Sequence, residues 1–259
     1  MTRALVTGAA RRLGRAMALA LAEEGYDVAA HYSGSEAEAR AVVDEIRSMG
    51  REAVLLQADL TAEAEAQGML GRAAEALGGS ITTLINNASI FECDSLGDAT
   101  RSSWDRHFES NLRAPFVLTQ ALAAQVPDPV TDAQGEPVAQ GLIVNMIDQR
   151  VRKLTPDYMS YTLAKSALWT LTQTSAQALA SRVRVNAIGP GPTLQGAAQT
   201  EAQFHHQRRA TVLGRGADAR DITDALRYFL GARAVTGQMM CVDGGQHLGW
   251  QTPDVTGVE

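Results

Sequence analysis

The stretch Ala4-Leu5-Val6-Thr7-Gly8-Ala9-Ala10-Arg11-Arg12-Leu13-Gly14 decides the fold of this chain. Residues 4–7 form the short apolar run of a buried strand, and residues 13–24 have the apolar spacing of a helix. Glycines between a strand and a helix let the backbone turn tightly and approach a phosphate, whose charge meets the helix N-terminus. The middle glycine of the usual G-x-G-x-x-G pattern is missing. The position after an N-terminal strand still indicates a dinucleotide-binding turn.

The rest of the chain continues to alternate strand and helix. Short apolar runs predict further strands at residues 26–31, 53–57, 81–86, 141–147, 183–187 and 239–242. Amphipathic stretches predict further helices at residues 36–49, 62–77, 102–125, 158–180 and 219–230. This alternation indicates βαβ units and therefore an α/β fold, with a parallel sheet covered by helices on both faces.

Two segments break this rhythm. Residues 127–140, rich in Pro, Asp, Gln and Gly, are expected to form a surface loop. Residues 189–216 are expected to form a long loop that contains Pro190 and Pro192, and loops of this length often serve as lids over a substrate. Because the sequence has no internal repeat or linker, we interpret residues 1–259 as a single domain.

Composition excludes several classes of function. The net charge is −6, whereas a nucleic-acid-binding protein is expected to carry a basic stripe. Cys93 and Cys241 are far apart and form no CxxC motif, so neither a disulfide framework nor a metal site is expected. The chain enters its first strand without a signal segment and has no run of about 18 apolar residues. We therefore expect no membrane span and a cytoplasmic location.

The end of the second predicted strand bears on which dinucleotide is bound. It reads His31-Tyr32-Ser33-Gly34-Ser35 and lacks the acidic residue that would hold a ribose 2′-hydroxyl and repel a 2′-phosphate. Arg12, His31 and Ser35 can instead donate hydrogen bonds to phosphate. The sequence therefore favours NADPH/NADP+ as the cofactor. The alternative is that Arg11 and Arg12 are only exposed helix charges.

The segment Tyr161-Thr162-Leu163-Ala164-Lys165 lies in a predicted helix, where residues four apart share a face. An ammonium beside a phenol stabilises the phenolate, so Lys165 is expected to lower the pKa of Tyr161 and make it a general acid. Of the 23 Lys and Arg residues only Lys153 and Lys165 are lysines, which makes a lysine at this spacing informative. The alternative is an exposed tyrosine stacked on the stem of the lysine.

Taken together, these features resemble the short-chain dehydrogenase/reductase family over residues 2–249. The resemblance rests on the glycine turn and on Asp59-Leu60, Asn86-Asn87-Ala88, Asn111, the Tyr161 and Lys165 segment, and the runs VNAIGPG at 185–191 and VDGG at 242–245. It implies a Rossmann-type, doubly wound parallel sheet of about seven strands.

The resemblance also implies roles for individual residues. Tyr161 is the implied acid, Lys165 touches the nicotinamide ribose, and Asn111 holds a proton-relay water. Asn111 could instead cap a helix turn, and Asp59 could simply begin a turn. Besides Tyr161 and Lys165, the expected cofactor-binding residues are Gly8, Arg12, Leu13, Gly14, His31, Tyr32, Ser35, Asp59, Leu60, Asn87, Ala88, Ser89, Pro190, Gly191, Thr193 and Leu194.

One residue departs from the family pattern. Family members usually place a serine thirteen residues before the tyrosine, and this chain has Asp148 there, with no Ser or Thr before Thr155. A serine hydroxyl can donate to a carbonyl oxygen, whereas an ionised carboxylate only accepts and would repel a developing alkoxide. Asp148 therefore argues against ordinary ketone reduction. It suits a substrate that needs a proton on nitrogen, such as a ring C=N.

In this respect the chain resembles the pteridine reductases, a subgroup that pairs an Asp with the Tyr and Lys. They share the glycine turn, a His-Tyr strand end, and the run Asn86-Asn87-Ala88-Ser89-Ile90-Phe91. The resemblance implies that Phe91 stacks on a pterin and that Arg12 and Ser89 bind the pterin and cofactor phosphates. Asp148 and Tyr161 would also contact the substrate. Plain packing of Phe91 in a lid stays an alternative.

Three functions fit the sequence. The first is NADPH-dependent reduction of a dihydropterin, with the proton coming from Tyr161 or, through water, from Asp148. The second is reduction of another carbonyl or imine with Asp148 protonated, and the third is a non-catalytic NADP(H)-sensing module. The expected partners are a small-molecule substrate and further copies of the chain in a homotetramer, in which the segment after Gly245 borders a neighbouring active site.

Overall fold

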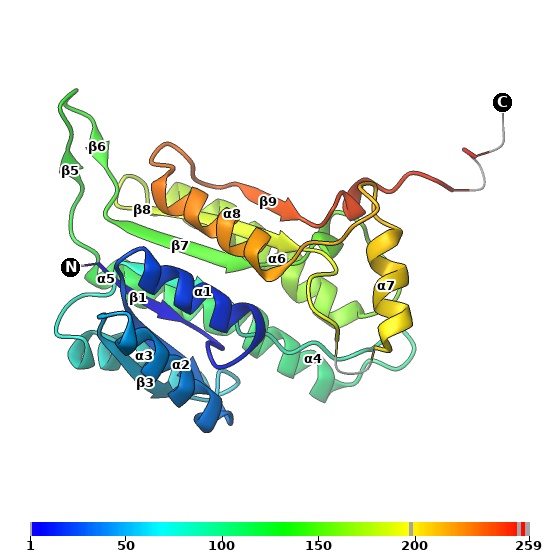
Figure 1. Cartoon of the computed structure of the whole chain (residues 1–259), viewed down its shortest axis with the longest axis horizontal. Coiled ribbons are helices and arrows are strands. Elements are labelled where there is room, and N and C mark those ends of the chain that lie inside the picture. Colours follow the sequence, from blue (N-terminus) through cyan, green and yellow to red (C-terminus); the bar gives the residue numbers. More distant parts are fainter. Residues whose placement is uncertain (1, 197–198, 253–254, 257–259) are drawn as a thin grey trace.

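A seven-stranded parallel sheet forms the centre of the molecule (Figure 1). The structure, a computed structural model, describes residues 2–196, 199–252 and 255–256. The strand order is β3-β2-β1-β4-β7-β8-β9. The strands are β1 (Arg3–Val6), β2 (Asp27–Tyr32), β3 (Ala53–Gln57), β4 (Thr83–Asn86), β7 (Gly141–Met146), β8 (Val183–Pro190) and β9 (Met239–Val242). The α/β, doubly wound fold with about seven strands is confirmed.

Helices cover both faces of this sheet because successive side chains of a strand point to opposite faces. From β1, Ala4 and Val6 enter one core together with α1 (Arg12–Glu23), α2 (Glu36–Ser48) and α8 (Ala219–Gly231). Leu5 enters the other core together with α3 (Glu63–Ala76), α5 (Ala114–Gln125) and α6 (Met159–Ala178). In Figure 1, α1 and α8 lie side by side over the sheet.

The predicted helix at residues 102–125 differs from the structure in its interior. It consists of α4 (Arg101–Phe108), a π-helical turn at Glu109–Arg113, and α5. A π turn widens the backbone spacing and is frequent at functional sites. This one contains Asn111, a residue singled out from the sequence.

The two irregular segments are more ordered than expected. Residues 127–140 contain an antiparallel hairpin of β5 (Val130–Thr131) and β6 (Pro137–Val138). The expected lid begins inside β8 and includes α7 (Glu201–Arg209), which starts at a capping box formed by Thr200 and Gln203. The capping box was readable from the sequence, since a Thr followed three residues later by Gln is a helix-start signal.

The candidate site lies where the strand order reverses. From β1 the chain builds outward to β3, and it then returns to the other side of β1 with β4. In open α/β sheets, ligands bind at the carboxyl ends of the strands at such a switch point. The segments that follow β1, β4, β7 and β8 therefore meet at one edge. Within the described residues no helix has the length and apolar character needed to cross a membrane.

Candidate active site

The glycine turn after β1 brings strand, helix and neighbouring strand into close contact. Gly8 has a φ of +64°, in the left-handed region that favours glycine. A Cβ on Gly14 would lie 2.0 Å from the Gly8 carbonyl oxygen and 2.6 Å from Asn87 Nδ2, so only glycine fits there. Arg12, two residues before Gly14, also lies in the left-handed region, with a φ of +53°. A glycine would adopt this conformation without strain.

Thr7 and Asn87 join the ends of β1 and β4. The Thr7 hydroxyl accepts hydrogen bonds from the backbone N–H groups of Asn87 at 2.8 Å and Ala88 at 2.9 Å. The Asn87 side chain donates to the Thr7 carbonyl at 2.8 Å. Thr7 was missed as a site residue. Its place directly before the first glycine, with a hydroxyl able to accept from the next strand, was the available signal.

His31 has a structural role rather than the expected contact with phosphate. It is 2% exposed, and its Nδ1 accepts the Gly8 N–H at 3.0 Å. The proton therefore resides on Nε2, which donates to the Ala58 carbonyl at 3.1 Å. Burial lowers the pKa of His31, which keeps the ring neutral. Both ring nitrogens are thus used to hold the glycine turn, and the expectation that His31 donates to a 2′-phosphate is corrected.

At the end of β2, Arg11 rather than Arg12 lies beside Ser35. Arg11 donates to the Ser35 hydroxyl at 2.5 Å and forms an ion pair with Glu38 at 2.9 Å. Arg12 instead donates to the backbone carbonyls of Gln195 at 2.7 Å and Leu194 at 3.0 Å. Arg12 therefore ties the start of α1 to the lid, and Arg11 is the arginine that lies beside Ser35.

The other residues expected around the cofactor divide into core and turn positions. Leu13, Tyr32 and Leu60 pack into the hydrophobic cores. Asp59 begins a turn, as the simpler alternative held, because its Oδ1 accepts from the backbone and hydroxyl of Thr61. These two hydrogen bonds lower the pKa of Asp59 and keep it ionised.

The segment after β8 packs tightly against the end of β9. Gly191 donates its N–H to the Val242 carbonyl at 3.0 Å, and a Cβ on Gly191 would lie 2.6 Å from Asp243 Cα. Thr193 is buried and donates to the Gly191 carbonyl at 3.1 Å. Farther along the lid, Arg208 donates to the carbonyls of Pro192 and Ala217 and so holds the two ends of the lid together.

Three of the predicted catalytic residues meet above the end of β7. The Tyr161 hydroxyl donates to Asp148 Oδ2 at 3.0 Å. Lys165 is 2% exposed, and its ammonium donates to the Met146 carbonyl at 2.7 Å. The Lys165 nitrogen lies 5.7 Å from the centre of the Tyr161 ring. The Asp148 carboxylate is therefore the hydrogen-bond partner of the Tyr161 phenol. The Lys165 ammonium is bonded to the backbone of β7 instead.

This arrangement reverses the expected effect on Tyr161. Burial raises the pKa of Tyr161 well above 10, and the charge of Asp148 adds to the rise. Burial also raises the pKa of Asp148, against the opposing hydrogen bonds from Arg150 and Tyr161. For Lys165, burial lowers the pKa to about 8. The expectation of a Tyr161 pKa near neutrality is wrong, because the phenol is buried and the nearest charge is negative.

Ser89 and Asn111 complete the surroundings of the phenol. A hydrogen bond with Ser89 acts to lower the pKa of Tyr161. Asn111 is fully buried, and its side chain makes a reciprocal pair of hydrogen bonds with the backbone of Ile90, at 2.9 and 2.8 Å. Asn111 thus holds the strand-end segment next to Ser89. Asn111 lies in the π turn, and its side-chain amide points toward the Ile90 backbone.

Aromatic rings lie next to the Tyr161 phenol on the side where Phe91 is exposed to solvent. Phe91 is 52% exposed and stacks on Tyr158 with centroids 4.3 Å apart and planes 2° apart. Its ring also meets Tyr161 edge to face at 4.7 Å. Arg150 lies 4.9 Å from the centre of the Tyr158 ring. Tyr158 and Arg150 were not predicted as site residues, since an aromatic directly before a helix and an arginine in a turn are ordinary in sequence.

The segment after Gly245 folds back on its own chain as a 3₁₀ turn at Gln246–Leu248. His247 donates its backbone N–H to Asp243 Oδ2 at 2.8 Å, and its Nδ1 lies 2.7 Å from the same oxygen. Leu248 and Trp250 are exposed. Whether this segment borders a neighbouring subunit stays a prediction.

Comparisons with known proteins found a matching family model and similar solved structures. Residues 8–247 match the family model described as Enoyl-(Acyl carrier protein) reductase. The crystal structure of FolM Alternative dihydrofolate reductase 1 from Brucella suis in complex with NADP is 43% identical, with a TM-score of 0.90 and 98% of each chain covered.

Two curated relatives point to different substrates. The 3-oxoacyl-[acyl-carrier-protein] reductase FabG of Staphylococcus epidermidis is 32% identical over 251 residues, which cover 95% of this chain and 98% of the relative. Pteridine reductase 1 of Leishmania tarentolae is 32% identical over 280 residues, with 95% and 96% covered.

Proposed function

This chain belongs to the short-chain dehydrogenase/reductase family, and we propose that within it the protein is an NADPH-dependent reductase of dihydropterin rings. The single observation that supports this most is the Asp148 carboxyl group, 3.0 Å from the Tyr161 hydroxyl, where it can pass a proton through the phenol to a ring nitrogen. The relatives named for dihydrofolate and pteridine reduction act, by those names, on substrates that contain a pterin ring.

The site fits a phosphorylated dinucleotide. Helix α1 starts without a side-chain cap and has no acidic residue in its first turn, which leaves its N-terminus suited to a pyrophosphate. Gly8 and Gly14 allow the backbone to pack as closely as such a ligand requires. At the end of β2, Arg11 and Ser35 can donate hydrogen bonds to a 2′-phosphate. Neighbouring solved structures were determined with NADP, in agreement with NADP(H) as the cofactor.

When bound, NADPH supplies a hydride to a ring carbon, and the residues of this chain must supply the proton. Tyr161 alone is a poor source, because its phenolate would face the Asp148 carboxylate. The raised pKa of Asp148 allows that group to take up a proton from solvent. Tyr161 then gives its proton to the ring nitrogen and receives the proton of Asp148 across their hydrogen bond. The pair is left with one negative charge on Asp148, and a phenolate beside a carboxylate is avoided.

The remaining site residues act by binding and orientation. Phe91 offers a half-exposed ring on which a flat heteroaromatic substrate can stack, already braced by Tyr158. The Ser89 hydroxyl lies at the phenol and can hold the substrate ring there. Lys165 would hold the nicotinamide ribose, and Asn111, through the Ile90 backbone, keeps Ser89 and Phe91 in place. Arg12 acts on substrate and cofactor through the lid that it holds.

A second candidate is reduction of a carbonyl or another imine. The FabG relative, named for a 3-oxoacyl substrate, supports it, and so does the raised pKa of Asp148, because a protonated carboxyl can donate to a carbonyl oxygen. A non-catalytic NADP(H)-binding module is a weaker alternative, since Asp148, Tyr161 and Lys165 lie together at the end of β7. The homotetramer stays a prediction, which a mass measurement in solution tests.

The test is a side-by-side assay of the purified protein. NADPH oxidation is measured with a dihydropterin, dihydrofolate, a simple ketone and a 3-oxoacyl thioester. We expect the two pterin-containing substrates to be reduced with the highest kcat/KM. A protein that reduces only the thioester or the ketone would replace the first candidate with the second.

A further inference from the structure

The helix that carries Tyr161 begins without a cap of its own. Tyr158, the residue at its N-terminal boundary, has a φ of +58° and makes no side-chain capping bond. Its ring is instead stacked on Phe91. A helix start leaves backbone N–H groups that need acceptors, and a non-glycine residue in the left-handed region persists only where its surroundings hold it.

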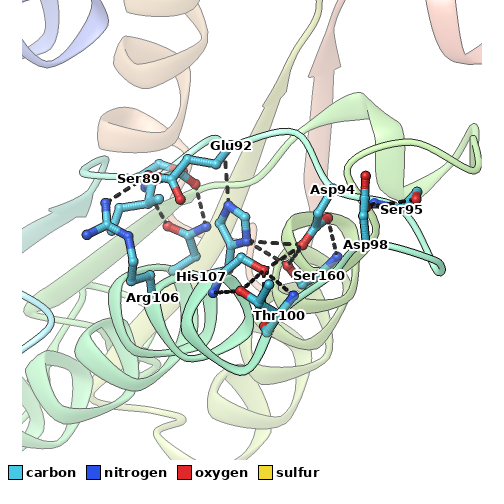
Figure 2. A network of polar contacts seen from close by, with 12 residues as sticks. Ser89, Glu92, Asp94, Ser95, Asp98, Thr100, Arg106, His107 and Ser160 are labelled. Atoms are coloured by element: carbon cyan, nitrogen blue, oxygen red, sulfur yellow. Dashed lines mark hydrogen bonds and ion pairs between the residues drawn. The ribbon is translucent and has the colours of Figure 1, made fainter.

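Asp94 supplies the missing acceptors from a distant part of the chain. Its backbone carbonyl accepts the Met159 N–H at 3.1 Å, and its Oδ1 accepts the Ser160 N–H at 3.0 Å. Its Oδ2 accepts the hydroxyl of Ser160 (Figure 2). The same oxygen accepts the hydroxyl of Ser103 at 3.3 Å. The carboxylate is 4% exposed and lies at the positive end of the helix dipole, where a negative charge is favoured.

His107 extends this network to the segment that carries Phe91. The imidazole is fully buried in α4, and its Nε2 accepts the Glu92 N–H at 3.1 Å. The ring proton is therefore on Nδ1, which donates to the Ser160 hydroxyl at 2.7 Å (Figure 2). Burial lowers the pKa of His107, although Asp94 opposes the shift, so the imidazole remains neutral.

The order of donors differs from that of a hydrolytic triad. His107 donates to Ser160, and Ser160 donates to Asp94, so the hydroxyl is held between the two and is not activated as a nucleophile. A fully bonded, buried polar network of this kind fixes geometry, because every group has one orientation that satisfies it. The network is therefore suited to positioning and not to chemistry of its own.

Two residues that this network holds are next to aromatic residues of the active site. Glu92 follows Phe91, and Ser160 precedes Tyr161. Phe91 contacts Tyr158 at 4.3 Å and Tyr161 at 4.7 Å between ring centres. A shift of the helix start relative to the 90–94 segment would thus move the stacking ring and the acid relative to one another.

We propose that Asp94, Ser160 and His107 form a positioning clamp that sets the Tyr161 hydroxyl and the Phe91 ring at their working separation. The clamp acts through the Met159 and Ser160 backbone on one side and through Glu92 on the other. Its effect on turnover rests on the proposed function, whereas its hold on the helix start does not.

The direct test replaces Asp94 by alanine and by asparagine. Asp98→Asn is a matched control, because Asp98 accepts from the N–H and hydroxyl of Ser95 just as Asp94 accepts from those of Ser160. Asp98 is exposed, and these two bonds join it to its own segment and not to α6. We expect Asp94→Ala to lower kcat/KM for a dihydropterin by about tenfold or more, as one lost charge-assisted hydrogen bond predicts. Asp94→Asn keeps an acceptor, so its kcat/KM should lie between those of wild type and Asp94→Ala. The kcat/KM of the control should stay within about twofold of wild type.

A positioning role and a merely structural role predict different results for Asp94→Ala. If the clamp positions the site, NADPH affinity is unchanged within about twofold and kcat/KM for the dihydropterin falls. Parallel losses of NADPH affinity, kcat/KM and thermal stability would overturn the proposal, as would wild-type kcat/KM in folded Asp94→Ala. If Asp94→Ala does not fold, Ser160→Ala decides in its place, since it removes the hydroxyl bonds and keeps the backbone N–H.

Hydrogen exchange separates this proposal from the proposed function. In Asp94→Ala, the peptide that spans residues 156–165 should exchange faster than in wild type, and the Asp98→Asn peptide should not. That result stands even if the wild-type protein ignores dihydropterins, in which case only the proposed function fails. Unchanged exchange in Asp94→Ala would show that the helix start does not depend on the clamp.

Discussion

Replacing Asp148 by serine tests the proton relay and the choice of substrate together. In the structure Asp148 accepts from Tyr161 at 3.0 Å and from the Arg150 N–H at 2.8 Å, and in its ionised form it is the charged partner in both bonds. Losing one charge-assisted hydrogen bond costs about 1.5–3 kcal/mol. This loss corresponds to a drop in kcat/KM for a dihydropterin of about ten- to 150-fold. The serine hydroxyl restores a donor for a carbonyl oxygen, so turnover of a simple ketone should rise.

The pH profile separates the relay from simple positioning. Because burial raises the pKa of Asp148, the fraction of protonated carboxyl grows as pH falls through that raised value. The relay requires the protonated form, so kcat/KM for the dihydropterin should increase toward acidic pH in wild type. Asp148→Asn keeps the size and an acceptor but cannot pass a proton, and its profile should lose this increase.

Asp157→Ser is the matched control, since Asp157 lies exposed in the same segment after β7. The assay is steady-state NADPH oxidation with the dihydropterin and the ketone, at several pH values for each variant. Asp148→Ser protein that reduces the dihydropterin as well as wild type would refute the reasoning, and so would an identical pH profile in Asp148→Asn. The control should match wild type within about twofold.

Three other substitutions test separate parts of the site. Tyr161→Phe should remove most turnover, because the phenol is the group that delivers the proton, and should leave NADPH affinity, measured by cofactor fluorescence, within a few-fold of wild type. Near-normal turnover would show that another group is the acid. Phe91→Ala should raise the KM of a dihydropterin more than that of a small ketone, since stacking serves a flat ring, and equal effects on both would favour plain packing. Arg11→Ala should weaken NADPH binding more than NADH binding in parallel titrations, because Arg11 lies at Ser35 where the 2′-phosphate is expected; an equal loss for both cofactors would place the phosphate elsewhere.

Long periodic elements were predictable because local sequence determines them. Helix α6 was expected at residues 158–180 and is found at Met159–Ala178. β3 and β9 have the predicted bounds. The π turn at Glu109–Arg113 was hidden inside one expected helix, since no residue type marks a single widened turn.

Within the site, the residues that come together were easier to predict than their burial and their neighbouring charges. Asp148, Tyr161 and Lys165 come together as the motif and the strand order imply. The direction of the Tyr161 pKa was not predictable, because it depends on burial and on which charge is nearest to the hydroxyl. His31 shows the same limit. Its type suggests a phosphate contact, and only its two backbone partners reveal that it holds the glycine turn.

The clamp around Asp94 was beyond the reach of sequence patterns for another reason. Its members are separated by 66 positions between Asp94 and Ser160 and by 53 between His107 and Ser160. A helix cap supplied by the residue at the boundary can be recognised from spacing. A cap supplied by another segment becomes visible only when the fold brings the two together.

The most direct test of the central claim is the rate of NADPH oxidation by the purified wild-type protein with a dihydropterin, compared with a 3-oxoacyl thioester under the same conditions. The Asp148 and Tyr161 pair, with Phe91 beside it, predicts rapid reduction of the dihydropterin and slow reduction of the thioester. Rapid reduction of the thioester, with no reaction of the dihydropterin at millimolar concentration, would contradict the account.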